Sequence, residues 1–399
     1  MPEFMTIFNK LLKLLGLDKG LVSVAGGNTI ASITGAVFWL FVAALMSKAE
    51  YGQLNYFLST AFLFSSLSLL GLGTTVTTFL SKGDESVKYQ ANLLVIFSNC
   101  AIFLLLLIFI NNLSVGILLF GLSFFAMSQA NYLGQRNYKK YSYIVIGQRL
   151  LNVPLSLLLF LIAGVDGVII GYAISTLLFS YNFFRSFKGV KLQFSSLRAK
   201  LPFMLHSYSV SIFGTVASNV DKLLIAPLFG FELLGLYQMG FQFLTFLSII
   251  PSSLFQFLLP QEVAKIQQKK TVIKGITVSV IFTIIFFIAI PVIISFIFPH
   301  FKESIEVSQI MIFGIIPSTI SAIMYSRFFR EEKSKVVLIP STVYVSTLLI
   351  LIYFLGITYG LVGLGFASLI SLSLQCITIL IISKFVYHKI NSNHNADIT

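Results

Sequence analysis

Long apolar stretches fill almost the whole of this 399-residue chain, and only short connectors separate them. A helix needs roughly 20 apolar residues to cross the hydrocarbon core of a membrane, which is about 30 Å thick. The mean hydropathy of +0.93 and the charged content of 10% agree with a chain that lies in lipid. We therefore predict twelve transmembrane helices, over residues 21–46, 53–80, 91–111, 114–132, 141–163, 165–184, 204–228, 234–259, 274–298, 306–328, 336–356 and 360–386.

The residue pattern within these stretches favours helices over strands. The stretches lack the polar alternation of a porin strand and are far longer than such a strand. Inside hydrocarbon, every backbone polar group must find its partner within the protein, which leaves bundled helices. The predicted fold class is an all-α integral membrane protein.

Basic residues in the connectors predict the orientation, because Lys and Arg favour the cytoplasmic side. With a cytoplasmic N-terminus, 24 of the 27 Lys and Arg residues lie in or beside the inside connectors. Both termini are then cytoplasmic, and we expect a multi-pass protein of the cell (inner, cytoplasmic) membrane. This topology accounts for the net charge of +13, so the charge does not indicate nucleic acid as a partner.

The longest connector, at 185–203, divides the twelve predicted helices into six and six. We expect six-helix bundles over 21–184 and 204–387, with this connector as a cytoplasmic linker between them. An amphipathic cytoplasmic segment is expected over 1–20. The polar tail over 388–399 is expected to be unstructured.

An internal repeat is indicated by a shift of 183 residues, which aligns Gly52 with Gly235 and Lys82 with Lys265. Two such halves keep the same orientation and would enclose a cavity between them. Prolines inside predicted helices remove backbone hydrogen bonds and are expected to bend or loosen them. These prolines are Pro154, Pro251, Pro291 and Pro317.

Arg149 lies inside a predicted span, and an ionisable residue at bilayer depth is by default a functional hypothesis. It follows the basic connector at Lys140 by about nine residues, or roughly 13 Å of helix. Gln148 and Asn152 occupy nearby positions. Two interpretations stay open: Arg149 faces a wet cavity and binds a phosphate through two hydrogen bonds, or it reaches back to the cytoplasmic surface.

Asp221 and Lys222 are adjacent in the seventh predicted span. As helical neighbours they point about 100° apart, so we do not expect them to pair with each other. Each then needs another partner or water, unless both reach the external interface. Two roles stay open for Asp221, the acidic residue that lies well inside a span: it binds a coupling ion, or it only balances the charge of Lys222. His206, near the cytoplasmic end of this span, is expected to be interfacial.

Two pairs of polar residues lie one helical turn apart: Asn28 with Ser32, and Gln238 with Gln242. Such pairs would either line a sugar-binding lumen through neutral hydrogen bonds or join membrane helices to each other. The predicted substrate-binding residues are Arg149, Lys222, Gln148, Asn152, Asn28, Gln238 and Gln242.

Motifs for catalysis are absent from the sequence, which contains no P-loop, no metal-ligand spacing and no activated-serine pattern. The predicted outer connectors are barely turns, too short for a catalytic loop. We therefore expect no enzyme activity, no cofactor and no metal. Cys100 and Cys376 lie inside apolar spans without disulfide spacing, and core packing is the expected role of both.

Two segments of the sequence carry motifs that point to a known family of membrane proteins. The first, SKAEYGQLNYFLSTAFLFSSLSLLGLGTT, contains "EYG" after the first span. The second, SNVDKLLIAPLFGFELLGLYQMGFQFL, contains "DK", an apolar run, and a G-x-x-x-x-G-x-Y pattern at Gly230, Gly235 and Tyr237. With these motifs and the twelve-helix plan, the chain resembles over its full length the polysaccharide flippases of bacteria and archaea. These form the branch of the multidrug/oligosaccharidyl-lipid/polysaccharide exporter superfamily that includes the O-antigen translocases.

The resemblance implies two bundles that open alternately and move a polyprenyl-(pyro)phosphate-linked oligosaccharide from the cytoplasmic to the outer leaflet. It further implies membrane lipid and glycan-assembly proteins as partners, and an H⁺ or Na⁺ flow or the membrane potential as the driving force. Relatives usually carry a basic residue where the first span meets the outer turn. Here Met46 and Ser47 occupy that region, which shifts anion binding to Arg149 and Lys222.

Two other functions stay open. A cation-coupled multidrug antiporter of the same superfamily would share the fold but would need several lumenal acids, of which this chain offers one. A non-transporting membrane scaffold would have no use for a buried Arg and Lys.

Overall fold

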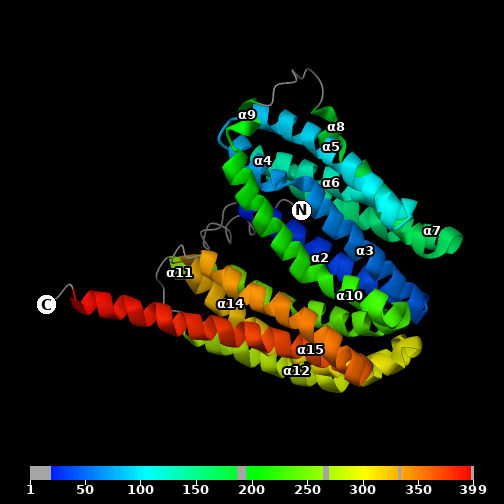
Figure 1. Cartoon of the computed structure of the whole chain (residues 1–399), viewed down its shortest axis with the longest axis vertical. Helices are drawn as coiled ribbons and strands as arrows, with labels where there is room; N and C mark the ends of the chain where they lie inside the picture. Colours follow the sequence, from blue (N-terminus) through cyan, green and yellow to red (C-terminus); the bar gives the residue numbers. More distant parts are fainter. Residues whose placement is uncertain (1–18, 187–194, 264–268, 331–333, 397–399) are drawn as a thin grey trace, which may run out of the picture. The chain divides into compact units, whose positions relative to one another are not determined.

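The computed structural model describes residues 19–186, 195–263, 269–330 and 334–396, and the described part is almost entirely helical, with no strand (Figure 1). The expected amphipathic segment 1–20 and the middle of the linker 185–203 lie mostly outside these residues. The helices are α2 (Lys19–Leu45), α3 (Lys48–Leu69), α4 (Leu72–Leu80), α5 (Ser86–Phe109), α6 (Leu113–Gly134), α7 (Tyr138–Leu178), α8 (Tyr181–Arg185), α9 (Ser195–Arg198), α10 (Leu201–Leu247), α11 (Ile249–Val263), α12 (Lys269–Ile297), η1 (Pro299–Ser304), α13 (Ile305–Ile312), α14 (Ile315–Arg330), η2 (Ser334–Val337) and α15 (Leu338–Ala396).

Twelve membrane-length segments are present in these described helices, as predicted. Eight of the described helices, or nine with the bent pair α3 and α4, are long and apolar enough to span a membrane. Three of them are far longer than one span needs, and each breaks at a glycine with positive φ. Each of these three therefore provides two segments, which raises nine to twelve. The breaks are at Gly164 in α7, Gly230 in α10 and Gly360 in α15.

The chain forms two compact units. Unit 1 comprises the described residues of Met1–Val42 and Tyr56–Asn219, and unit 2 those of Ala43–Asn55 and Val220–Thr399. Three helices are therefore divided between the units: α3 and α10 contribute a long part to each, and α2 contributes only its last residues, from Ala43 to Leu45, to unit 2. The bundles expected from sequence, 21–184 and 204–387, remain a prediction, since the compact units exchange two helical segments relative to them.

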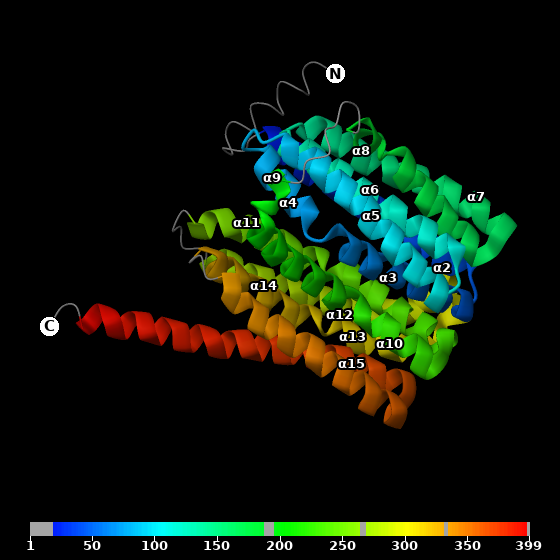
Figure 2. The ribbon, with the colours of Figure 1, turned by 45° about the horizontal axis from the view of Figure 1, so that its top comes forward.

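Within unit 1, α5, α6 and α7 lie side by side in both ribbon views (Figure 1 and Figure 2). Their shared core contains Phe124 of α6, whose ring stacks on Phe183 of α8 with centroids 4.3 Å apart. Within unit 2, α12 and α15 both pack on α14. These contacts join helices by apolar side chains on the sides that face each other.

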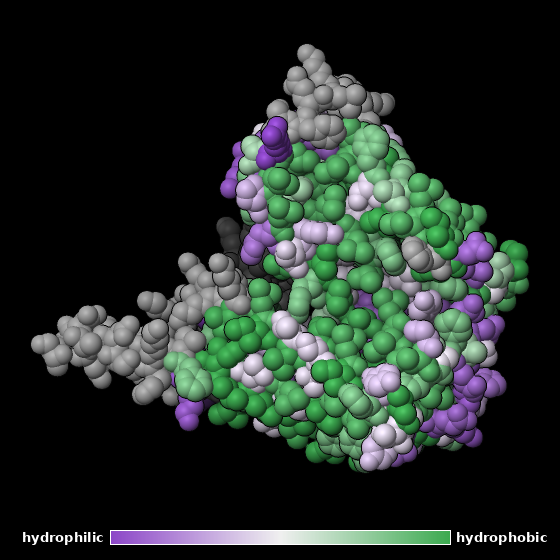
Figure 3. Space-filling model, in the orientation of Figure 1, coloured by the Kyte–Doolittle hydropathy of each residue, from purple (hydrophilic) through white to green (hydrophobic). Residues whose placement is uncertain are grey.

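Apolar side chains also cover the outer surface, as expected where lipid replaces water. Figure 3 shows hydrophobic residues over most of the visible face of the helices. Large apolar side chains of the described helices are strongly exposed: Ile162 is 81% exposed and Phe296 is 83% exposed. Such apolar exposure would be unfavourable in water, and the structure therefore supports the predicted multi-pass membrane protein.

Helix breaks accompany two of the four predicted bending prolines. Pro251 is the third residue of α11, after the break at Ser248, and Pro317 is the third residue of α14. Near a helix start the missing N–H of proline is tolerated, because the first turn has no partner for it. Pro154 and Pro291 lie within α7 and α12, where the helix continues through them.

Two expectations need correction. The tail over 388–399 was expected to be unstructured, yet α15 continues as helix to Ala396, because nothing in this polar segment interrupts helical backbone bonding. Cys376 is buried as expected, but Cys100 is exposed on α5. A position inside an apolar span does not imply burial, since such a helix has a lipid-facing side.

Candidate functional site

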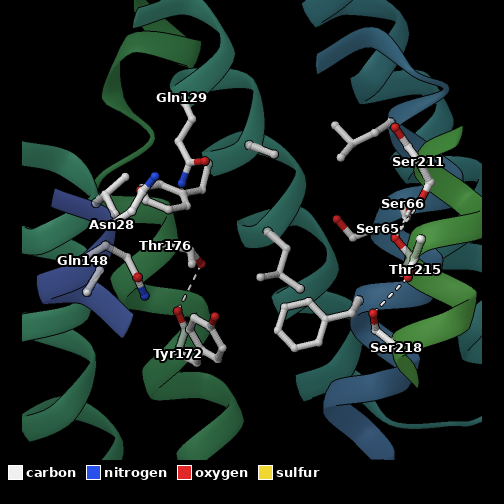
Figure 4. A pocket seen from close by; sticks show the side chains of 18 of the residues that line it. Asn28, Ser65, Ser66, Gln129, Gln148, Tyr172, Thr176, Ser211, Thr215 and Ser218 are labelled. Carbon is white, nitrogen blue, oxygen red and sulfur yellow. Dashed lines mark hydrogen bonds between the residues drawn. The ribbon is translucent and has the colours of Figure 1, made fainter. Parts of the chain in front are cut away.

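A polar cavity of about 780 Å³ lies within unit 1 and is bounded by α2, α3, α6, α7 and the first part of α10. Figure 4 shows its two walls: Asn28, Gln129, Gln148, Tyr172 and Thr176 on one side, and serine and threonine side chains on the other. The second wall comprises Ser65, Ser66, Ser211, Thr215 and Ser218. The cavity has the size of a small-molecule site.

Arg149 of α7 is among the residues that line this cavity, and its binding of a phosphate stays a prediction. Its Nη1 donates to the hydroxyl of Tyr172 at 3.4 Å, and its guanidinium carbon lies 5.7 Å from the centroid of the Tyr172 ring. Tyr172 in turn packs edge-on against Phe62. The guanidinium is thus held at one edge by an aromatic side chain while it borders the cavity.

Neutral hydrogen-bonding groups line the same cavity as Arg149. Asn28 accepts a hydrogen bond from the Tyr141 hydroxyl at 3.1 Å, and Gln148 donates to Ser175 at 2.9 Å. On the facing wall, Thr215 donates to Ser66 at 3.0 Å. Each of these hydrogen bonds holds a polar side chain in place while the side chain still borders the cavity. Fixed neutral donors and acceptors of this kind suit a ligand rich in hydroxyl groups.

Four of the predicted substrate-binding residues are not among those that line the cavity: Asn152, Lys222, Gln238 and Gln242. Asn152 is 1% exposed and accepts from Ser156 within α7. Gln238 and Gln242 lie on α10 in unit 2, where both are buried. The amide oxygen of Gln238 has no hydrogen-bond partner in the described structure, so it keeps an unused acceptor.

The expectation that Asp221 and Lys222 do not pair is wrong. The Lys222 Nζ donates to both carboxylate oxygens of Asp221, at 3.0 and 3.2 Å, and both side chains are buried in unit 2. Their Cβ atoms do diverge around the helix, but the four-carbon lysine chain is long enough to fold back. Neither residue reaches an exposed interface, whereas His206 is exposed, as expected for an interfacial residue.

Of the motif residues of the second segment, Tyr237 contacts this ion pair, while Gly230 and Gly235 meet demands of the backbone. The Tyr237 hydroxyl donates to Asp221 at 3.0 Å. Gly230 has φ 85° at the break in α10, a conformation that favours glycine. A Cβ on Gly235 would lie 1.9 Å from the carbonyl oxygen of Lys48, so only glycine allows α3 and α10 to approach this closely.

Solved structures of known transporters share this fold. The chain is similar to the lipid II flippase MurJ in an inward closed conformation, with 13% identity, 89% of this chain and 87% of that chain covered, and a TM-score of 0.74. It is similar to a multidrug resistance MATE family transporter of the MOP superfamily in an inward-facing conformation, with 13% identity, 94% and 99% covered, and a TM-score of 0.72.

A third similar structure is a MOP superfamily transporter from Pyrococcus furiosus, described as having a binding pocket of reverse polarity that suggests a different function. Identity is 13%, coverage is 92% of this chain and 95% of that chain, and the TM-score is 0.60. The chain has the fold of the MOP superfamily transporters. No protein-family model matches the chain, and no curated protein sequence matches it.

Several cavity residues were missed by the sequence analysis: Gln129, Tyr141, Tyr172, Ser65, Ser66, Ser211, Thr215, Ser218 and Asn219. Serine and threonine are common in membrane helices because their hydroxyls bond to the helix itself, as Thr215 also does to Ser211. Their spacing therefore carries little signal. Gln129 carried a stronger sequence signal for a cavity, because a long amide side chain inside an apolar stretch needs polar surroundings.

Proposed function

We propose that the chain is a polysaccharide flippase that moves a polyprenyl-(pyro)phosphate-linked oligosaccharide from the cytoplasmic to the outer leaflet of the cell membrane. One observation carries the proposal: Arg149 is the charged side chain among the residues that line the cavity, and none of those residues is Asp or Glu. The fold, shared with a lipid II flippase and with multidrug transporters, is compatible with it.

A single arginine in an otherwise neutral cavity favours an anion. Guanidinium groups bind phosphate through two parallel hydrogen bonds, and the interaction strengthens where water is scarce. Arg149 uses one nitrogen on Tyr172, which leaves other donors for a phosphate oxygen. We infer that the (pyro)phosphate of the cargo binds here while the polyprenyl chain stays in the bilayer.

Neutral donors and acceptors suit the sugar. We propose that Asn28 and Gln148 contact sugar hydroxyls in unit 1, beside the aromatic rings of Tyr141 and Tyr172. The remaining candidates are buried against neighbouring helices, and we propose that they contact cargo in a second conformation. These are Asn152, Lys222, Gln238 and Gln242.

Alternating access requires two packings of the same helices, with the cargo shifting the balance between them. The breaks after Leu69 and at Ser248 supply bending points along helices that cross from one compact unit to the other. We propose that an inward flow of H⁺ or Na⁺, or the membrane potential, drives the cycle, with Asp221 as the candidate coupling acid.

Substitution of Arg149 tests the proposal. In proteoliposomes with a labelled polyprenyl-diphosphate oligosaccharide, R149A should lower translocation on the order of tenfold to a hundredfold, because a charge-assisted hydrogen bond is lost. R149K should recover part of it, since lysine keeps the charge without the paired donors. R198A is the matched control, since Arg198 is exposed on α9. Full translocation by a well-expressed R149A protein would refute the proposal.

A multidrug antiporter is the second candidate, favoured by the likeness to multidrug transporters. Amphipathic cations need acidic partners, and the cavity residues include none. This function predicts reduced drug accumulation in cells that express the chain, with R149A leaving the effect unchanged. Drug export without transfer of the glycolipid would select it.

A further inference from the structure

A buried ion pair in unit 2 is formed by two residues that are not among those lining the cavity. Asp221 is 2% exposed and Lys222 is 5% exposed. Both carboxylate oxygens accept hydrogen bonds from the Lys222 Nζ, and one also accepts from the Tyr237 hydroxyl. The ammonium further lies 4.1 Å from the centroid of the Phe241 ring. Asp221 and Lys222 precede the break at Gly230, while the two aromatic residues follow it.

The surroundings of the pair are rich in oxygen. Tyr344, in the first part of α15, is within electrostatic range of Asp221, and Ser368, in its second part, is hydrogen-bonded to the Tyr237 side chain. The titratable or charged groups that face Asp221 are therefore Lys222, Tyr237 and Tyr344. A carboxylate with hydroxyl oxygens is the chemistry that binds hard cations, and an aromatic face adds attraction for a cation.

The geometry places a cation where a free ion would bind. Adjacent helical residues diverge, so Lys222 must fold back to reach Asp221, and its ammonium contacts both oxygens and an aromatic face at once. A buried carboxylate without a partner is strongly unfavourable. If the ammonium were removed, the carboxylate and the hydroxyls would remain, and a small cation or a proton would have to replace it.

We propose that the Lys222 ammonium is a tethered cation that fills a monovalent-cation site formed by Asp221, Tyr237 and the ring of Phe241. In the native chain the Lys222 ammonium balances the charge of Asp221, so the site needs no free ion and is filled whether or not external Na⁺ is present. Removal of the ammonium opens the site to free Na⁺. This inference does not require that the cargo be a glycolipid, and it limits the coupling role of Asp221 to events that displace Lys222.

The test is thermal unfolding of the purified full chain in NaCl or in choline chloride at equal ionic strength. Wild-type protein should have the same Tm in both salts. Lys222→Met keeps the length of the side chain without its charge, and its Tm should rise saturably with Na⁺, by on the order of a few °C. The double variant D221N/K222M should lose this response. K48M, which removes an ammonium from an exposed ion pair, is the matched control and should show no preference for Na⁺.

Either of two results would overturn the inference. One is a Tm of the wild-type protein that rises saturably with Na⁺ and no longer does so in D221N. Such a result would mean that the native site binds free Na⁺ and is not filled by the Lys222 ammonium. The other is a K222M protein indifferent to Na⁺ at both neutral and alkaline pH, where a competing proton is progressively removed. If K222M does not fold, Lys222→Gln replaces it, and the wild-type measurement decides independently. If the wild-type protein does not transfer the glycolipid but the Tm values respond to Na⁺ as predicted here, the proposed function is contradicted and the tethered-cation inference is not.

Discussion

Each residue of the "EYG" segment has its own structural role. Ser47 and Glu50 form a capping box at the start of α3: the Ser47 N–H donates to Glu50 Oε2 at 2.9 Å, and the Glu50 N–H donates to Ser47 Oγ at 3.3 Å. Tyr51 is buried edge-on against Phe301. Gly52 contacts α10 closely. The segment that suggested a family thus holds the start of α3 within unit 2.

Glycine at positions 52 and 235 is required by the close approach of α3 and α10. An added Cβ would lie 1.8 Å from the Phe231 carbonyl oxygen at Gly52, and 1.9 Å from the Lys48 carbonyl oxygen at Gly235. Because backbone must move, G52A and G235A should each destabilise the chain by about 1–3 kcal/mol, seen as a lower Tm. G73A is the control, since no atom lies within 4 Å of its added Cβ. Unchanged Tm values for both would show that the helices separate easily.

The ion pairs of Lys48, in the expected outer turn, should make the stability of the chain depend on pH. Its hydrogen bond to Glu303, at 2.7 Å, is the largest influence that raises its pKa above the ordinary 10.5, and Glu232 adds to it. A raised lysine pKa stabilises the fold below the ordinary value, and the contribution is lost as pH rises through the raised one. The Tm difference between wild type and K48M should therefore shrink as pH rises above 10.5. A difference that persists there would assign the effect to packing of the lysine chain.

At the scale of elements, two turns repeat with the same geometry. Gly164 has φ 57° and ψ −134°, and Gly360 has φ 56° and ψ −132°. Three residues later, a Cβ on Gly167 would lie 2.0 Å from the Leu159 carbonyl oxygen, and one on Gly363 would lie 1.9 Å from that of Leu355. The two turns therefore have equivalent geometry in the two sequence halves, although their separation of 196 residues differs from the 183-residue shift that aligns Gly52 with Gly235.

Alanine at these turns is expected to weaken the helical hairpins. G164A and G360A place a side chain at a backbone conformation that costs about 1–3 kcal/mol for residues other than glycine, so Tm should fall by a similar amount in both. G26A is a helical control with open space around the added Cβ. A fall in one variant but not the other would mean that the turns are not equivalent in energy.

The bent pair α3 and α4 shows how a break is held. The axes differ by 50° across Leu70 and Gly71, both with positive φ. A Cβ on Gly71 would lie 2.5 Å from the Met204 carbonyl oxygen. The bend thus packs directly on the start of α10 in unit 1, and this tertiary contact helps to hold Leu70 in a backbone conformation that is unfavourable for a residue other than glycine.

At the scale of the whole molecule, the predicted orientation can be tested directly. Positive connectors place Arg198 inside and Lys302 outside, and both residues are exposed. In a background with Cys100 and Cys376 replaced by Ala, R198C should react with an impermeant maleimide only after the membrane is opened, whereas K302C should react in intact cells. The reverse labelling pattern would invert the topology and with it the direction of transport.

The sequence by itself determined the number and approximate bounds of the membrane helices, because hydropathy is a local property and each span needs enough apolar residues to cross the bilayer. It also placed the turns between most consecutive spans, including those at Gly164 and Gly360. Arg149 stood out for the same reason, since a charge within an apolar run is visible without any structure.

Only the tertiary structure decided which polar residues meet. Thr215 bonds to Ser66, 149 residues away, and nothing in either local segment indicates the other. The Asp221–Lys222 pair depended on the conformation of a long side chain, which helical spacing does not determine. Gly52 and Gly235 aligned as repeats in sequence, but their packing against each other in unit 2 follows from how the helices cross. Side-chain conformation and helix crossing are set by the surrounding packing, which is a property of the folded chain.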